Sequence, residues 1–125
     1  MSLLLDTQAL LWCLVAPQRL RRDARRRIES PSETVYVSAV SAWEIELKRA
    51  LGKLKAPDDL EDQMKDKRFA ELPIQLRHVR ALSTLPDLHR DPFDRMLVAQ
   101  AQTERLVLVT SDDQVLAYPV TTLRA

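Results

Sequence analysis

Short runs of consecutive hydrophobic residues mark the predicted strands of this chain. Three such runs, at residues 3–5, 35–37 and 107–109, each end at a polar residue, which is typical of strands covered on both faces of a sheet. Residues 72–74 form a shorter run that contains a proline and therefore fits only an edge strand. Val120 marks a last edge strand. The pattern thus predicts a sheet with buried central strands.

Apolar residues at helical spacing fill the segments between these runs. The periodicity predicts helices at residues 8–15 and 20–28, from a cap at Ser38 or Ser41 to Leu51, at 57–70, around Leu76, Val79 and Leu82, and from Asp91 onward. Gly52 suits the left-handed position that ends a helix. Asp91 and Pro92 are favoured as a cap and as a first helical residue.

Strands and helices alternate along the whole chain. Parallel strands need a covering crossover between them, so the order predicts an α/β fold with a central parallel sheet and helices on both faces. The 125 residues fit one domain, residues 1–125. In such sheets ligands bind beyond the carboxyl ends of the strands.

Composition excludes several classes of protein. No apolar run approaches the roughly 20 residues that span a bilayer, so no membrane role is expected. The single cysteine, Cys13, cannot form an internal disulfide, and the cytoplasm is the expected compartment. Gly52 is the only glycine, which rules out a Walker A loop and a dinucleotide-binding turn.

Positive charge is concentrated although the net charge is only +1. Six arginines crowd residues 19–27. Each phosphate that a cation neutralises releases counterions and strengthens binding, so this segment could bind RNA. A solvated helix face is the equal alternative.

Four carboxylates stand at strand ends or in the first turns of helices. Asp6 and Asp112 follow buried strands, while Glu44 and Asp94 lie where helices begin at the same edge. All four can therefore converge. Two like charges about 4 Å apart repel by roughly 4 kcal/mol at an effective dielectric of about 20, and a divalent cation would compensate them.

Local structural roles compete with this interpretation. Ser41 and Glu44 fit a capping box, and Asp94 is favoured by the helix dipole alone. Asp112 could form an Asx-turn or a cap. Asp6 has little local reason to close a strand of three leucines. All four acids together are stronger evidence for a metal site than any one of them.

Carboxylate oxygens favour a hard cation, Mg²⁺ or Mn²⁺. Zinc fits poorly because His78 and His89 stand apart from Cys13 and are expected at the surface or at helix caps. A cation held by carboxylates polarises a phosphoryl oxygen and lowers the pKa of its water, which suits phosphodiester hydrolysis.

In the order and spacing of five segments, the chain resembles the PIN-domain toxins of the VapC type from bacterial VapBC toxin–antitoxin pairs. The segments are LLLDTQALLWCL, SAVSAWEIELKRALGKL, LPI, HRDPFDRMLVAQA and LVLVTSDDQV. The resemblance implies a flavodoxin-like α/β/α sandwich and an endoribonuclease that depends on Mg²⁺ or Mn²⁺. It also implies inhibition by a VapB-type antitoxin, and relatives commonly form homodimers.

The acidic positions of that family fall on Asp6, Glu44, Asp94 and Asp112, with Asp91 as an addition and Thr110 as a hydroxyl that supports the metal water. We expect Asp6, Asp94 and Asp112 to hold the metal, with Glu44 completing the site or orienting the attacking water. Asp113 leaves the register of Asp112 ambiguous. Gln8 departs from the family, where relatives often carry histidine, and this affects substrate fit more than metal binding.

Two further residue pairs bear on the substrate. Arg90 and Arg95 flank Asp94 and could hold the scissile phosphate or pair with nearby acids. Trp12 and Trp43 lie in apolar helical patterns, so they are expected in the core or a subunit interface rather than as platforms for bases.

Other classes of function fit less well. A receiver domain would need an adjacent acidic pair near Asp6 and a late lysine, and no lysine follows Lys67. A phosphatase with D-x-D chemistry is opposed by Gln8. A catalytically inactive PIN-like module that binds RNA or protein remains the alternative, against which the intact acids argue.

Overall fold

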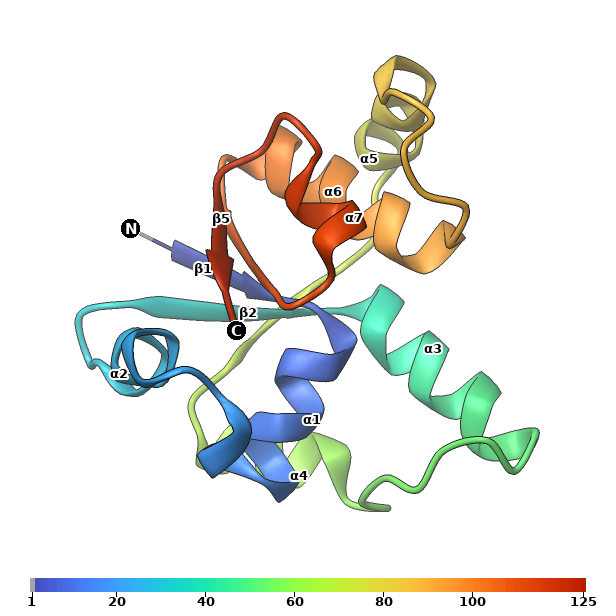
Figure 1. The fold of residues 1–125 in the computed structure, drawn as a ribbon. Helices are drawn as coiled ribbons and strands as arrows, with labels where there is room; N and C mark the ends of the chain where they lie inside the picture. Colours follow the sequence, from blue (N-terminus) through green and yellow to red (C-terminus); the bar gives the residue numbers. More distant parts are fainter. Residues whose placement is uncertain (1) are drawn as a thin grey trace.

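The computed structural model describes residues 2–125 and shows five strands and seven α-helices in that range (Figure 1). The elements in chain order are β1 (Ser2–Leu5), α1 (Thr7–Val15), the 3₁₀ turn η1 (Pro17–Arg19), α2 (Arg22–Glu29), β2 (Thr34–Ser38), α3 (Ala39–Ala50), α4 (Leu60–Asp66), β3 (Ala70–Leu72), α5 (Leu76–Ala81), η2 (Leu82–Thr84), α6 (Pro92–Glu104), β4 (Val107–Thr110), α7 (Asp113–Leu116) and β5 (Thr122–Arg124). The predicted α/β class is confirmed.

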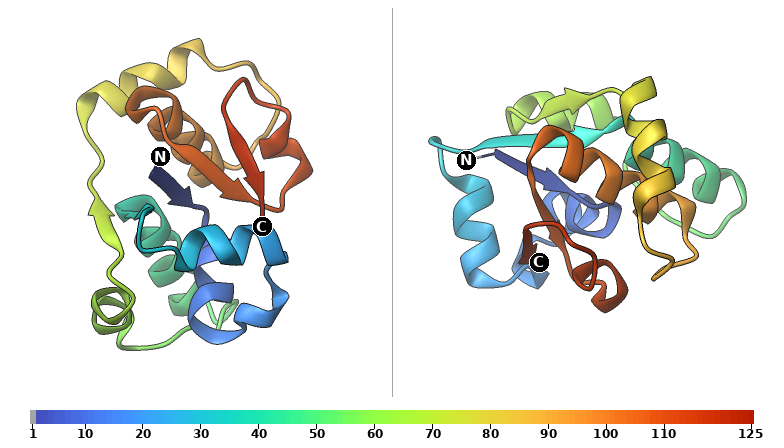
Figure 2. Two further views of the ribbon diagram at one scale, coloured as in Figure 1. Left: turned by 90° about the vertical axis from the view of Figure 1, so that its left-hand side faces the viewer. Right: turned by 90° about the horizontal axis from the view of Figure 1, so that it is seen from above.

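All neighbouring strands pair in parallel, in the order β3-β2-β1-β4-β5. From β1 the sheet extends on one side through β2 to β3. The chain then crosses back, and β4 and β5 extend the sheet on the other side of β1 (Figure 2). This reversal opens a crevice beyond the carboxyl ends of β1 and β4, where ligands of such sheets bind. Leu5 is in register with Val109, so Asp6 follows directly beside Thr110.

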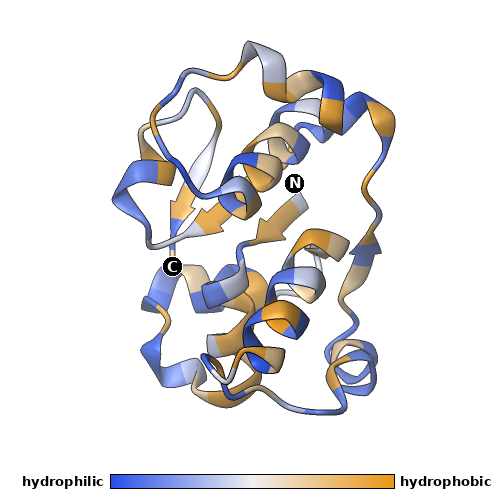
Figure 3. Ribbon diagram, turned by 90° about the vertical axis from the view of Figure 1, so that its right-hand side faces the viewer, coloured by the Kyte–Doolittle hydropathy of each residue, from blue (hydrophilic) through white to orange (hydrophobic). Residues whose placement is uncertain are grey.

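Helices cover both faces of the sheet, as a three-layer sandwich requires. On one face, helices α1 to α4 pack against alternate strand residues such as Leu3 and Leu5. On the other, α5, α6 and α7 pack against Leu4 and Leu108. The central strands are hydrophobic along their length, whereas the helices carry both hydrophobic and hydrophilic residues (Figure 3). No helix within residues 2–125 is long and apolar enough to cross a membrane.

Cap residues agree with the predicted helix ends in α3 and α6. Of the two candidate serines, Ser38 is the cap of α3, because its hydroxyl accepts from the Val40 N–H at 3.0 Å. Asp91 caps α6 as predicted. Gly52, with φ of +71°, takes the left-handed conformation just after α3, where a side chain would be strained.

The segment after α3 differs from its prediction. Helix α4 covers Leu60–Asp66 rather than 57–70, and β3 covers Ala70–Leu72 rather than 72–74. Pairing with β2 at Val37 and Ser38 sets this register, which local periodicity does not encode. The last strand, β5, likewise begins after Val120.

Helix α5 does not bury its predicted apolar face. Leu76 is 80% exposed and Val79 is 46% exposed, while His78 is fully buried. The His78 ring packs against α6, with Nε2 2.9 Å from Glu104 Oε2, and its Nδ1 accepts from the Gln75 N–H at 3.0 Å. The predicted cap role of His78 is confirmed, and a polar contact replaces the expected hydrophobic one.

Candidate metal and catalytic site

The four predicted acids line one pocket of about 250 Å³ at the carboxyl edge of the sheet. Its lining comes from α1, α3, α6 and the segment after β4 and comprises Asp6, Thr7, Gln8, Leu11, Glu44, Lys48, Leu54, Asp91, Asp94 and Asp112. These positions are up to 106 residues apart in the sequence (112 minus 6). The fold therefore brings together residues that the sequence placed separately.

Asp6 is buried between β1 and α1. Its Oδ1 accepts from the Ala9 N–H at 2.8 Å and caps α1, so the expectation that Asp6 has little local role is wrong. Burial raises the pKa of Asp6 to about 6, opposed by hydrogen bonds from Thr110 and the Ala9 amide and reinforced by the charges of Glu44 and Asp112. The side chain thus both starts a helix and adds charge to the pocket.

Glu44 does not form the capping box that its spacing from Ser41 allowed. Its Oε1 accepts from the Thr7 hydroxyl at 2.6 Å, and its Oε2 accepts from Lys48. Ser41 lies inside α3 and is buried, with its hydroxyl 3.1 Å from that of Thr7. A contact between α1 and α3 therefore decides the position of Glu44, and Lys48 partly neutralises it.

Asp91 and Asp94 have different roles at the start of α6: one caps the helix and the other lines the pocket. Asp91 Oδ1 accepts from the N–H groups of Phe93 (2.8 Å) and Asp94 (3.2 Å), so Asp91 is the cap. The carboxylate of Asp94 is released from capping and faces the pocket. Burial raises the pKa of Asp94 to about 7, followed by repulsion from Asp91, Asp6 and Glu44.

Asp112 and Thr110 occupy the turn after β4. Asp112 Oδ1 caps α7 by accepting from the Gln114 N–H at 2.8 Å, and the Asp112 N–H donates to Thr110 Oγ1 at 3.1 Å. Asp113 instead pairs with Arg124 at 2.7 Å and is 85% exposed. Of the two residues, Asp112 lines the pocket and Asp113 does not.

His89 contacts two of the acids that line the pocket, and sequence reasoning missed it. Its Nε2 lies 3.0 Å from Asp94 Oδ2 and 3.0 Å from Asp112 Oδ2, and only 12% of its side chain is exposed. Of the two expected positions, surface or helix cap, His89 is not exposed at the surface but lies beside the cap of α6, where its Nδ1 accepts from the Asp91 N–H at 3.2 Å. Thr7 and Lys48 were missed as well; only Lys48 left a signal, its spacing of four residues from Glu44 on one helix.

The predicted phosphate-binding arginines differ in their placement. Arg95 turns away from the acids: its guanidinium donates to the Pro86 carbonyl at 3.0 Å and the Tyr118 hydroxyl at 3.1 Å. The guanidinium ties the loop before α6 to the segment after α7, and a contact of Arg95 with the scissile phosphate stays a prediction. Arg90 is exposed beside His89.

The donor set fits a hard divalent cation. Asp6, Asp94 and Asp112 offer carboxylate oxygens at one edge, and His89, Asp94 and Asp112 place three potential ligand atoms within 4.8 Å of one another. Burial is the main cause of the raised pKa values of Asp6 and Asp94, and the charges of neighbouring acids raise them further. Oxygen-rich sites of this kind suit Mg²⁺ or Mn²⁺.

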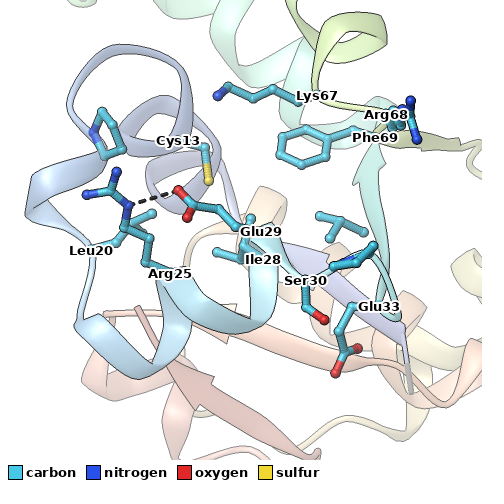
Figure 4. A pocket seen from close by; sticks show the side chains of 13 residues that line it. Cys13, Leu20, Arg25, Ile28, Glu29, Ser30, Glu33, Lys67, Arg68 and Phe69 are labelled. Carbon is cyan, nitrogen blue, oxygen red and sulfur yellow. Dashed lines mark hydrogen bonds and ion pairs between the residues drawn. The ribbon is translucent and has the colours of Figure 1, made fainter.

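A larger pocket, about 480 Å³, lies between α1, α2 and the segment before β3 (Figure 4). Cys13 points into it, and an Arg25–Glu29 ion pair of 2.9 Å crosses its wall. Burial raises the pKa of Cys13 to about 11, so this thiol stays protonated at neutral pH. The residues that line this larger pocket carry charges of both signs, so it is a poorer metal site than the acidic pocket.

Comparison with known proteins agrees with this geometry. The sequence model of the PIN domain matches residues 3–119. Among curated proteins, none matches the chain significantly. In fold, the chain is similar to a VapBC2 structure from Rickettsia felis bound to a promoter DNA fragment, with a TM-score of 0.74, 14% identity and 98% of each chain covered.

Two further solved structures have a similar fold. A DNA-bound VapBC from Salmonella typhimurium gives a TM-score of 0.71 at 16% identity, covering 98% of this chain and 97% of that one. A toxin–antitoxin complex from Klebsiella pneumoniae gives 0.66 at 19% identity, covering 97% and 95%. The likeness extends along nearly the whole length of each chain.

Proposed function

The chain belongs to the PIN domain family, and from this premise we propose that it is the VapC-type toxin of a type II toxin–antitoxin pair. Its proposed activity is that of a metal-dependent endoribonuclease that cleaves RNA phosphodiester bonds. The observation that carries the proposal is the convergence of Asp6, Glu44, Asp94 and Asp112 in one pocket at the carboxyl edge of the sheet.

The proposed roles follow from the contacts of each acid. Asp6, Asp94 and Asp112 would hold Mg²⁺ or Mn²⁺, which when bound lowers the pKa of water and polarises a phosphoryl oxygen. Glu44 lines the same pocket and is held by Thr7 and Lys48, where it would complete the site or orient the attacking water.

Supporting groups would keep these carboxylates in place. Thr110 donates to Asp6, and Asp91 fixes the first turn of α6 so that Asp94 faces the pocket. Arg90, exposed at the rim, is the residue left to contact an RNA phosphate.

Cleavage of single-stranded RNA by the purified chain tests the activity. We expect cleavage with Mg²⁺ or Mn²⁺ that EDTA abolishes, leaving 5′-phosphate and 3′-hydroxyl ends. Asp6→Asn and Asp94→Asn should each lower the rate at least about 100-fold, the scale of removing one charged catalytic group. Asp113→Asn is the matched control, because this acid is exposed and faces Arg124.

Three outcomes would contradict this function: cleavage that survives EDTA, full activity of both asparagine variants, or no binding of Mn²⁺ in calorimetry. The last would favour a catalytically inactive PIN-like module that binds RNA or protein. Expression of the chain alone should also arrest growth, and co-expression of the antitoxin should restore it.

The proposed partners are a VapB-type antitoxin, an RNA substrate and a second copy of the chain, all in the cytoplasm. Trp43 and Leu47 on α3 and Leu51 at its end follow one another at four-residue spacing and are 59%, 43% and 59% exposed. Contiguous exposed apolar side chains are typical of protein contacts. The expected core position of Trp43 is wrong, whereas an interface position stays a prediction that light scattering can test.

A further inference from the structure

His89 joins two acids that come from different parts of the chain. It lies in the loop before α6, and its Nε2 is 3.0 Å from Asp94 Oδ2 at the start of that helix. The same nitrogen is 3.0 Å from Asp112 Oδ2 after β4. One ring atom therefore contacts two of the three carboxylates to which the proposed function assigns the cation.

The other ring nitrogen identifies the tautomer. The Asp91 N–H donates to His89 Nδ1 at 3.2 Å, so the lone pair of Nδ1 is engaged and the hydrogen resides on Nε2. An Nε2 that carries a hydrogen donates it to Asp112 Oδ2, while Asp94 Oδ2 lies in close contact with the same nitrogen, and no lone pair remains for a cation. The ring thus supports the site from outside rather than acting as a ligand.

We propose that His89 is a positioning residue that keeps the carboxylates of Asp94 and Asp112 together for the cation: its Nε2–H donates to Asp112, and the same nitrogen lies against Asp94. This inference rests on the proposed function, since it concerns the same cation. Without the ring, Asp112 loses a donor and the two carboxylates face each other directly and repel. Outer partners of metal ligands typically change metal affinity about 10- to 100-fold when removed.

Calorimetric titration of Mn²⁺ and, separately, of Mg²⁺ tests the proposal with the full-length chain. His89→Ala should weaken the binding of both cations by the same factor, about 10- to 100-fold. His89→Gln keeps a donor near the Nε2 position and should recover most of the affinity. Leu88→Ala, at the exposed preceding residue, is the control and should bind both cations as the wild type does. Circular dichroism verifies that each variant is folded.

Two results would overturn the role of His89. Unchanged or tighter cation binding in His89→Ala would show that the ring only fills space. A loss much larger for Mn²⁺ than for Mg²⁺, without recovery in His89→Gln, would show that the imidazole is a direct ligand, because nitrogen ligands favour Mn²⁺ over Mg²⁺. Failure of the proposed function appears differently, as a wild-type chain that binds neither cation.

Discussion

Replacing Asp94 should show most clearly how much an ionised carboxylate in the pocket destabilises the folded chain. The pKa of Asp94 in the folded chain is about 7 against 3.8 in the unfolded chain, chiefly through burial. Between those pH values the folded state binds the extra proton, so stability falls as pH rises from about 4 to about 7. Asp94→Asn removes this penalty. In the absence of metal we expect it to raise the free energy of unfolding by about 1–2 kcal/mol above pH 7.

Urea unfolding in EDTA at several pH values measures this difference. The stability curves of wild type and Asp94→Asn should approach each other near pH 4 and separate as pH rises. Mn²⁺ should stabilise the wild type and not the variant. Asp113→Asn serves as the control for loss of an exposed carboxylate. Curves that run parallel at all pH values would show that Asp94 ionises freely.

Sequence alone predicted the positions of the acids better than those of the residues that contact them. Asp6 directly follows buried strand β1, and Asp112 follows buried strand β4 after one intervening residue, a local pattern that the parallel sheet converts into proximity. The role of Glu44 was ambiguous, because its spacing from Ser41 fits a capping box, and only contact with Thr7, 37 residues away, resolves it. His89 was missed for the same reason: its contact with Asp112 joins residues 23 apart.

At the level of elements, α3 and α6 are the helices whose mutual placement sets the distance between Glu44 and Asp94. Two contacts join them. The Ser38 hydroxyl, at the cap of α3, donates to the buried Gln100 of α6 at 2.5 Å. Trp43 packs edge-to-face on Phe93, with ring centroids 4.8 Å apart.

Gln100→Leu should therefore destabilise the chain. The Gln100 amide also donates to the carbonyl of the exposed Pro73 at 3.2 Å. The leucine therefore leaves the buried Ser38 hydroxyl without an acceptor for its hydrogen, although this hydroxyl still accepts from the Val40 N–H. A buried donor without an acceptor costs about 1–3 kcal/mol, and we expect a loss of that size in denaturant unfolding. Gln102→Leu on the same helix breaks only an exposed bond and should change stability by less than about 0.5 kcal/mol. Equal losses in both variants would contradict a specific role for Gln100.

Helix and strand types were predictable where the apolar period is strong, as in β1, β4 and α6. The segment from 57 to 74 was not, because α4 is short and β3 is an edge strand whose register depends on β2. In α5 the hydrophobic spacing of Leu76 and Val79 was misleading, since buried His78 and Gln100 supply a polar contact instead. Burial of paired polar groups is invisible to a pattern that counts apolar residues.

Across the whole molecule, the arginine-rich helix and the acidic pocket lie at opposite ends of the sheet. Helix α2 leads into the start of β2, whereas α3, which carries Glu44, follows the end of β2 (Figure 1). The five residues of β2 separate these edges by about 16 Å at 3.3 Å per residue. Several arginines of this segment are also paired within the chain, as in Arg25–Glu29 and Arg27–Glu33.

RNA that reaches the acids should therefore depend on Arg90 rather than on α2. Replacing the exposed Arg22 and Arg26 together with glutamine should leave the KM for RNA within about twofold, whereas Arg90→Gln should raise it. Each lost contact with a single-stranded phosphate lowers the slope of log affinity against log salt by about 0.7. Measured over a series of salt concentrations, that change should appear in Arg90→Gln and be absent from the double variant. A reduced slope in the double variant would instead place the RNA across the amino edge of the sheet, so that the substrate spans both ends of the molecule.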